Sequence, residues 1–210
     1  MVKYKSFLSL SFLGMIFRVE GVYVPDCLEE ARRIVPGIDV DRFVKWRREG
    51  AVELVVEDVY RFVGNVAFSG VEVLFDRDGG SVAVRYPGGS VERVSIREYL
   101  GRLYCRVDPG SGDVFRLFPG SLYVVVTEEV VVPCDLLPFS VRFRSSFHRA
   151  GWVGKCANVD PGFRGRLHVL LYGPPGAPVL CIRRGVRAVQ VRFLKLSSPV
   201  EGYCGVWRGT

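Results

Sequence analysis

The chain has 210 residues, of which 49% are hydrophobic and 12% aromatic; it can bury a core, which excludes a disordered chain. With 29 Lys and Arg against 22 Asp and Glu it carries a formal charge of +7, so we expect anionic partners such as phosphates and nucleotides. The basic residues form no stripe with interleaved aromatics, which argues against nucleic-acid binding.

The N-terminus, residues 1–15, pairs a basic start with a short apolar run. That run is too short to span a bilayer, and no small-residue cleavage site follows it. We therefore expect a buried strand or a ragged start, with Met15 as an alternative translation start. We expect no membrane association and a cytoplasmic location.

Helical signals gather in the first quarter of the chain and in one later stretch. Asp26 and Glu29 have capping-box spacing ahead of a first helix, and Gly50 ends a second. Residues 95–100 are predicted to form one or two helical turns, opened by Ser95.

From residue 51 onward, short Val-rich runs alternate with Gly, Pro and Asp. Such runs recur about every ten residues, which predicts an all-β sandwich or barrel-like body. We therefore expect a mainly β protein in which an N-terminal strand and helical segment (1–50) packs on a β domain (51–210).

The cysteines show no CxxC pair and no His/Cys cluster, which makes a zinc site improbable. We expect them to be buried free thiols, with a disulfide as the alternative. Asn and Gln are depleted, as is typical of a thermophile, and the survivors are Asn65, Asn158 and Gln190. Both histidines, His148 and His168, lack Cys, Asp or Glu at ligand spacing, and we expect structural roles for them.

Two stretches carry residues suited to a nucleotide. In VRFRSSFHRAG (141–151), the guanidinium of Arg144 and the hydroxyls of Ser145 and Ser146 can hold a phosphate. The alternative is a helix start with Ser145 as its cap.

The second stretch is the turn ANVDPGFRG, between two predicted strands. Gly162 and Gly165 let the backbone approach a ligand closely, and Phe163 offers an apolar face to a sugar. Asp160 can take a proton from water as a general base, or it merely opens an Asp-Pro-Gly turn.

These motifs, with SGVEV (69–73), RRGVRAVQVRF (183–193) and the C-terminal SSPVEGYCGVWRG, resemble in order and spacing the dUTPase/dCTP deaminase superfamily. The resemblance covers about residues 64–210 and is closest to the archaeal deaminase-like dUTPases. It implies a dUTPase-like distorted β-barrel or jelly-roll (β-clip). It also implies a homotrimer with active sites between subunits.

The resemblance assigns a role to each motif. Asp160 would activate the attacking water, Phe163 would select deoxyribose, and Glu72, where the superfamily has Asp, would hold Mg²⁺ through water. The further residues expected to contact substrate are Arg144, Ser145, Ser146, Asn158, Gln190 and Tyr203.

One position separates the superfamily's two reactions. Deaminases carry a glutamate that moves protons at C4 of cytosine, and this chain has Leu170 there, ten residues beyond Asp160. Because leucine cannot move protons, we expect a dUTP diphosphatase that hydrolyses dUTP to dUMP and pyrophosphate by attack of an Asp160-activated water on the α-phosphorus.

Three alternatives to dUTP hydrolysis stay open. A catalytically silent nucleotide-binding paralogue fits the departures from the superfamily pattern at Glu72 and Phe143. A dCTP deaminase, or a bifunctional enzyme with both activities, is disfavoured by Leu170. A basic β-domain that binds nucleic acid has the charge in its favour but lacks a basic stripe.

Overall fold

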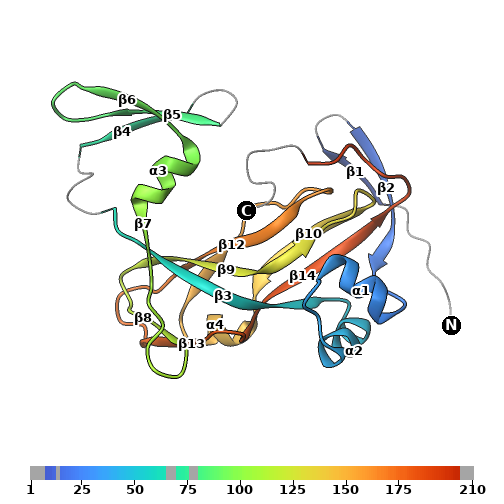
Figure 1. The fold of residues 1–210 in the computed structure, drawn as a ribbon. Helices are drawn as coiled ribbons and strands as arrows, with labels where there is room; N and C mark the ends of the chain where they lie inside the picture. Colours follow the sequence, from blue (N-terminus) through green and yellow to red (C-terminus); the bar gives the residue numbers. More distant parts are fainter. Residues whose placement is uncertain (1–7, 13–14, 65–69, 76–79, 204–210) are drawn as a thin grey trace.

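The computed structural model describes residues 8–12, 15–64, 70–75 and 80–203. Figure 1 shows a curled antiparallel sheet that carries two helices at one end and a small separate sheet at the other. The expected mainly β fold with a short helical N-terminal part is confirmed. No helix in the described ranges is both long and apolar enough to cross a membrane.

The helices and strands follow one another along the chain as labelled in Figure 1. The helices are α1 Leu28–Ile34, α2 Val40–Glu49, α3 Ile96–Leu103 and α4 Ser145–Arg149. The strands are β1 Leu8–Phe12, β2 Met15–Tyr23, β3 Val52–Phe62, β4 Glu72–Phe75, β5 Ser81–Arg85, β6 Val91–Ser95, β7 Tyr104–Arg106, β8 Val114–Leu117, β9 Leu122–Val131, β10 Leu136–Phe143, β11 Val153–Lys155, β12 Arg164–Tyr172, β13 Leu180–Arg183 and β14 Arg187–Leu196.

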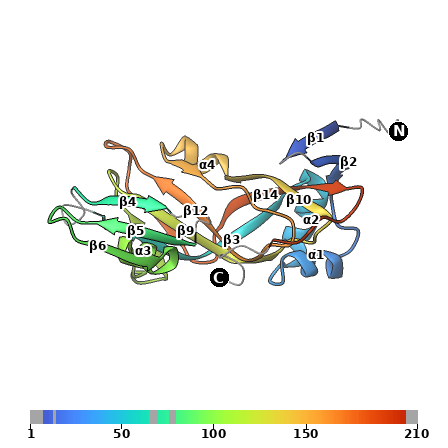
Figure 2. The same ribbon diagram turned by 90° about the horizontal axis from the view of Figure 1, so that it is seen from above.

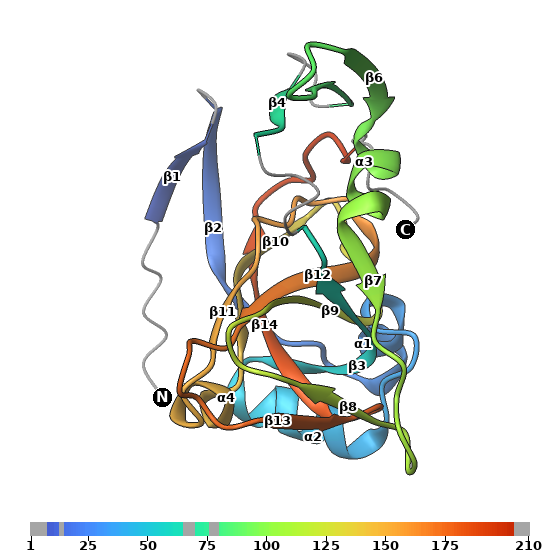
Figure 3. The same cartoon turned by 90° about the vertical axis from the view of Figure 1, so that its left-hand side faces the viewer.

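The large sheet has nine strands, in the spatial order β1-β2-β14-β3-β9-β12-β11, with β10 beside β14 and β7 beside β3. Its curl is visible in Figure 3. The N-terminal hairpin β1–β2 joins this sheet through β14, while the division of the chain near residue 50 stays a prediction.

The small sheet β4-β5-β6 and helix α3 form an extension with its own apolar cluster, which includes Val82, Val84, Ile96 and Tyr99. Figure 2 shows this extension at the end of the molecule opposite α1 and α2. Helix α3 begins as predicted, since the Ser95 hydroxyl accepts a hydrogen bond from the Glu98 backbone N–H at 3.2 Å.

The N-terminal helices match the predicted signals in part. Helix α2 ends at Gly50, which adopts the left-handed conformation at φ 66°, as expected. The capping box predicted from Asp26 and Glu29 is wrong, because α1 begins after Cys27, without a side-chain cap. The Asp26 backbone N–H donates instead to the Glu30 carboxylate at 2.7 Å.

The expectation of buried thiols is also wrong for part of the set. The five cysteines in the described ranges are all free, so no disulfide forms among them. Cys27, Cys105 and Cys181 are exposed, and Cys134 and Cys156 are half-buried. Cys204 lies outside the described residues.

Strand β12 shows the alternation that positions the functional site. Leu167, Val169 and Leu171 are 4% exposed or less and pack into the main core. His168 and Leu170 lie between them and point to the opposite, open face. Strand β12 is bordered by β9 and β11, so this open face belongs to the continuous sheet.

A buried ion pair joins α2 to the sheet. The Arg42 guanidinium, 3% exposed, binds both carboxylate oxygens of Glu128 on β9, with one nitrogen at 3.1 Å from Oε2. It also donates to the backbone oxygen of Glu53 on β3 at 3.1 Å. Glu128 in turn accepts from the Val55 backbone N–H at 2.8 Å, so one pair joins α2, β3 and β9.

Breaking this pair should destabilise the fold. Arg42→Ala leaves the buried Glu128 carboxylate without its cation, and Glu128→Ala leaves the buried Arg42 guanidinium with only the exposed Asp39 as an ion-pair partner. We expect each to lower the free energy of unfolding by about 3–5 kcal/mol. Urea denaturation measures this loss. As the control, Arg48→Ala removes an exposed pair with Glu49 and should cost under about 1 kcal/mol. Equal losses in the three variants would contradict the conclusion that the buried pair of Arg42 and Glu128 stabilises the fold.

Candidate functional site

The Asp-Pro-Gly-Phe turn is held against the end of strand β9. The Gly162 N–H donates to the Val132 backbone oxygen at 2.9 Å, and the Phe163 N–H closes the turn onto the Asp160 oxygen at 3.2 Å. The next residues run directly into β12, so the turn carries Asp160 to one end of that strand.

The C-terminal segment crosses over this turn. The Tyr203 N–H donates to the Pro161 oxygen at 2.9 Å, and the Tyr203 ring lies 5.9 Å from that of Phe163. Gly162, at φ 81°, is required there because an added Cβ would lie 2.6 Å from the Gly202 Cα. The turn and the C-terminal segment therefore build one edge of a site together.

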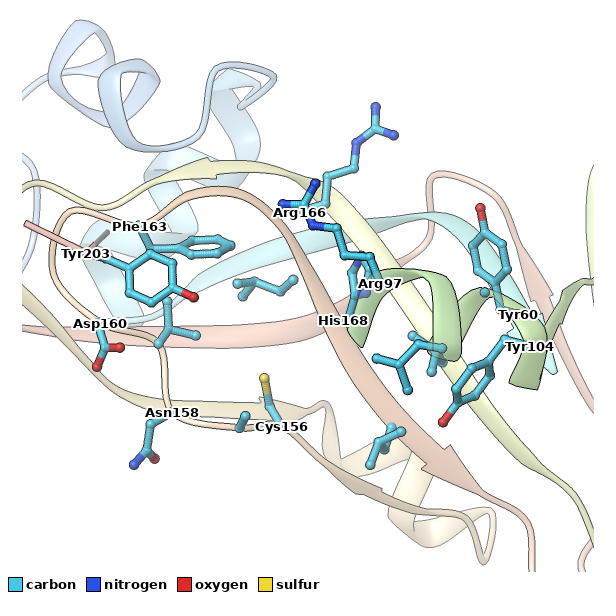
Figure 4. Close-up of a pocket in the computed structure, with 17 residues that line it drawn as sticks. Tyr60, Arg97, Tyr104, Cys156, Asn158, Asp160, Phe163, Arg166, His168 and Tyr203 are labelled. Atoms are coloured by element: carbon cyan, nitrogen blue, oxygen red, sulfur yellow. The ribbon is translucent and has the colours of Figure 1, made fainter. Parts of the chain in front are cut away.

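An open cavity of about 580 Å³, the hairpin hollow, lies along the turn and the open face of β12. Figure 4 shows Asp160, Asn158, Phe163 and Tyr203 at one end of it. The hollow falls in the size range of nucleotide and small-molecule sites. The predicted hairpin residues are thus gathered around one cavity.

The rest of the hollow is built by residues that sequence reasoning did not select. Tyr60 on β3 and Tyr104 at the start of β7 line the far end, and Arg97 of α3 and Arg166 of β12 lie between the two ends (Figure 4). Arg166 is paired with Glu57 at 2.8 Å. Tyr60, Arg97 and Tyr104 come from segments far from the hairpin in sequence, and only the fold brings them to it, whereas Arg166 follows the hairpin directly on β12.

His168 also lines the hollow, while the structural role expected for it stays a prediction. Burial lowers the pKa of its imidazole, because the surrounding chain disfavours the charged form. The same alternation that places Leu170 on the open face of β12 places His168 there, so a period-2 reading of the strand could have identified it.

Leu170 is 40% exposed and lies opposite Val124 of β9 in the strand register. Cys156 also lines the hollow, and burial raises the pKa of its thiol to about 11, so the sulfur stays protonated. In this part of the hollow the surface is therefore apolar, without a carboxylate at position 170.

The remaining predicted substrate residues form a second group away from the hollow. Ser145 and Ser146 are exposed at the start of α4, and the helix is preceded by Arg144, which makes no side-chain cap. Gln190 lies on β14 opposite Glu53 of β3. None of these four predicted residues lines the hairpin hollow.

Arg144 and Gln190 meet at the carboxylate of Glu53. The Arg144 Nε lies 3.1 Å and the Gln190 Nε2 3.3 Å from Glu53 Oε1, and the Lys45 ammonium of α2 lies 2.7 Å from the same oxygen. Burial alone would raise the pKa of Glu53, but the Lys45 hydrogen bond and the Arg144 charge outweigh it and hold that pKa below its usual range.

The structure does not place Glu72 near the hollow. Glu72 lies on β4 of the small sheet, where its carboxylate pairs with Arg85 at 3.0 Å. Within the described ranges, no group of three or more His, Cys, Asp or Glu residues could hold a metal ion. The residues present therefore do not fit the expected Mg²⁺ site, and the Mg²⁺ expectation stays a prediction from which we derive no step. Ser69 of the same motif lies outside the described residues.

Comparison with known proteins finds similarity to dCTP deaminases, both in a family match and in individual relatives. A family described as dCTP deaminase-like matches residues 79–196. A dCTP deaminase of Metallosphaera sedula is 40% identical over 100 residues, which cover 47% of this chain and 56% of that protein. A dCTP deaminase of Thermococcus gammatolerans is 34% identical over 125 residues, 59% of this chain and 78% of that protein.

A solved structure of 2'-deoxycytidine 5'-triphosphate deaminase from Agrobacterium tumefaciens shares the fold, with a TM-score of 0.55 at 17% identity. The match covers 83% of this chain and 48% of that one. The chain thus spans about half the length of several relatives that it matches.

These findings confirm the expected superfamily and overturn the expected reaction. The hydrolase assignment, a dUTP diphosphatase, is wrong, because the matched family and relatives are dCTP deaminases. That assignment rested on elimination from a single side chain, Leu170. The missing carboxylate at position 170 was therefore not a sufficient reason to assign hydrolysis.

The contact between the turn and the C-terminal segment can be tested at Gly162. Gly162→Ala introduces both a left-handed strain and an overlap with backbone atoms at 2.6 and 2.7 Å. We expect a loss of about 2–5 kcal/mol in the free energy of unfolding, measured by urea denaturation. Gly176→Ala is the matched control, because φ is 89° there and no atom lies within 4 Å. Equal losses in both variants would contradict the described contact.

Proposed function

Because the chain belongs to the dCTP deaminase-like family, we propose that it deaminates dCTP to dUTP and ammonia. The observation that supports this most is the hairpin hollow, which gathers Asp160, Asn158, Phe163 and Tyr203 around a cavity of nucleotide size. The assignment of these four residues to the nucleoside is part of the proposal.

In the proposed reaction, the oxygen of a water molecule forms a bond to C4 of cytosine and the bond from C4 to the amino nitrogen breaks. Both protons leave the water, which leaves a carbonyl at C4. One of them is taken up by ring N3, which becomes the N3–H of uracil, and the other by the amino nitrogen, which departs as ammonia. We assign the transfers to the carboxylate and the imidazole that line the hollow, Asp160 and His168. Lowering of the His168 pKa favours the neutral imidazole, which can accept a proton.

The predicted residues outside the hollow suit a site completed by a second copy of the chain. Arg144, Ser145, Ser146 and Gln190 lie together on α4, β14 and the segment between β10 and α4. They do not line the hollow of their own chain. We propose that they contact the phosphates of a nucleotide bound in the hollow of a neighbour, within a homotrimer.

A second candidate is a nucleotide-binding paralogue without catalysis. The observation that favours it is Leu170, an apolar side chain on the face where proton transfer would occur. In that case dCTP would bind in the hollow and remain unchanged.

The reaction is tested by ammonia release from dCTP and dUTP. We expect release from dCTP alone, and a loss of about 100-fold or more in kcat for Asp160→Asn, since a general base contributes on that scale. Asp41→Asn, on the exposed side of α2, is the matched control and should be unchanged. Binding of dCTP by wild type without any release would exclude deamination and leave the paralogue.

Position 170 gives a gain-of-function test. Leu170→Glu places a carboxylate on the hollow face of β12 at a side chain already 40% exposed, and we expect kcat for deamination to rise by about tenfold or more. Tyr172→Glu adds the same charge to the same face outside the hollow and should have no effect. If Leu170→Glu binds dCTP without any rise in rate, a carboxylate at position 170 takes no part in proton transfer and the predicted gain is wrong.

A further inference from the structure

Lys45 lies on α2, outside residues 79–196 of the family match, and no motif of the sequence selected it. We propose that Lys45, held beside Arg144 by Glu53, is a further contact for the phosphate chain of the nucleotide. That the anion belongs to a nucleotide rests on the proposed function. The anion site itself rests on the contacts among these three residues.

Hydrogen-bond donors from three elements converge on one carboxylate oxygen. Three donor nitrogens, from Lys45, Arg144 and Gln190, lie at 2.7, 3.1 and 3.3 Å from one oxygen, Glu53 Oε1. They come from α2, from the residue before α4, and from β14. Donors brought from three elements to one point form the kind of arrangement that binds an oxyanion.

Two positively charged side chains lie close together in this cluster. The Lys45 ammonium and the Arg144 guanidinium lie within about 6 Å of each other, a distance at which like charges repel. Glu53 is the one carboxylate that contacts both of them among the described residues, so a single negative charge lies between the two positive ones. The Glu49 carboxylate, at 3.9 Å from Lys45, is more distant.

Both cations are accessible to a ligand from solvent. The Glu53 side chain is 1% exposed, whereas those of Lys45 and Arg144 are 21% and 38% exposed. The carboxylate therefore lies beneath the cations, and both cations reach solvent above it. Glu53 Oε2 is buried without a hydrogen-bond partner, so the carboxylate takes its donors on one oxygen only.

Lys45 and Arg144 have N–H donors beyond those that contact Glu53. A lysine ammonium has three N–H donors and an arginine guanidinium five. Arg144 uses its Nε on Glu53 and one Nη1 contact, at 3.4 Å, on the Arg187 backbone oxygen. Both cations can therefore bind a further oxyanion while Glu53 still holds them in place.

The position of Lys45 is fixed by the buried ion pair of α2. Arg42, one turn earlier on the same helix, donates to the backbone oxygen of Glu53 at 3.1 Å. The helix is thereby anchored at the very residue whose side chain Lys45 contacts. Lys45 is thus pre-positioned, which lowers the entropy cost of contacting a ligand.

The test uses the full chain and isothermal titration with inorganic tripolyphosphate, dCTP and deoxycytidine. We expect Lys45→Met to raise the Kd for tripolyphosphate and for dCTP by about tenfold or more, and to leave that for deoxycytidine unchanged. Lys45→Arg keeps the positive charge and the N–H donors and should stay within about threefold of wild type. Arg48→Met, which removes a positive charge from the exposed side of the same helix, is the matched control and should have no effect.

Equal changes in Lys45→Met and Arg48→Met would overturn the proposal, because they would show a long-range charge effect only. If Lys45→Met does not fold, Lys45→Gln, which keeps a donor for Glu53, must show the same selective loss of tripolyphosphate binding. A normal Kd for that variant would also overturn it.

The outcomes separate the anion site from the proposed reaction. If wild type binds tripolyphosphate through Lys45 but neither binds nor deaminates dCTP, the anion site stands and the proposed function fails. If Lys45→Met binds and deaminates dCTP as wild type does, the function stands and the role of Lys45 is excluded.

Discussion

The buried pair of Arg42 and Glu128 is the contact on which the arrangement of the site depends. One guanidinium binds β9 through a carboxylate and β3 through the backbone oxygen of Glu53. Strand β9 is the neighbour of β12, which carries the hairpin and the open face of the hollow. The same pair anchors α2 and so brings Lys45 to Glu53. An isolated charge at this depth would be costly, so each partner is retained because the other is present.

The two groups of proposed ligand residues differ in their chemistry. The hairpin hollow is largely apolar and offers aromatic rings, an amide, a carboxylate and an imidazole, which suit a base and a sugar. The cluster around Glu53 is cationic and suits phosphates. A nucleotide needs both surfaces, and the chain presents them at separate places. Pairing the hollow of one copy with the cations of another would join them, and this is the physical reason for proposing an oligomer.

Much of this arrangement could be predicted from local signals. Gly50 and Ser95 marked helix ends correctly, because caps act within a few residues. The hairpin residues Asn158, Asp160 and Phe163 line one cavity, because a tight turn keeps neighbours together. Tyr60, Arg97 and Tyr104 were not predictable, since α3 and β7 approach β12 only through tertiary packing. The wrong reaction followed from letting one missing carboxylate, at Leu170, decide between two reactions of a superfamily that the other motifs identify but do not separate.

The most direct measurement follows dCTP and dUTP together by proton and phosphorus NMR in the presence of the wild-type chain. Deamination predicts that the cytosine signals of dCTP give way to uracil signals while the triphosphate signals persist. Loss of the dUTP triphosphate signals, with appearance of pyrophosphate and unchanged cytosine, would contradict the account. It would show that the hollow, despite its family, serves hydrolysis at phosphorus.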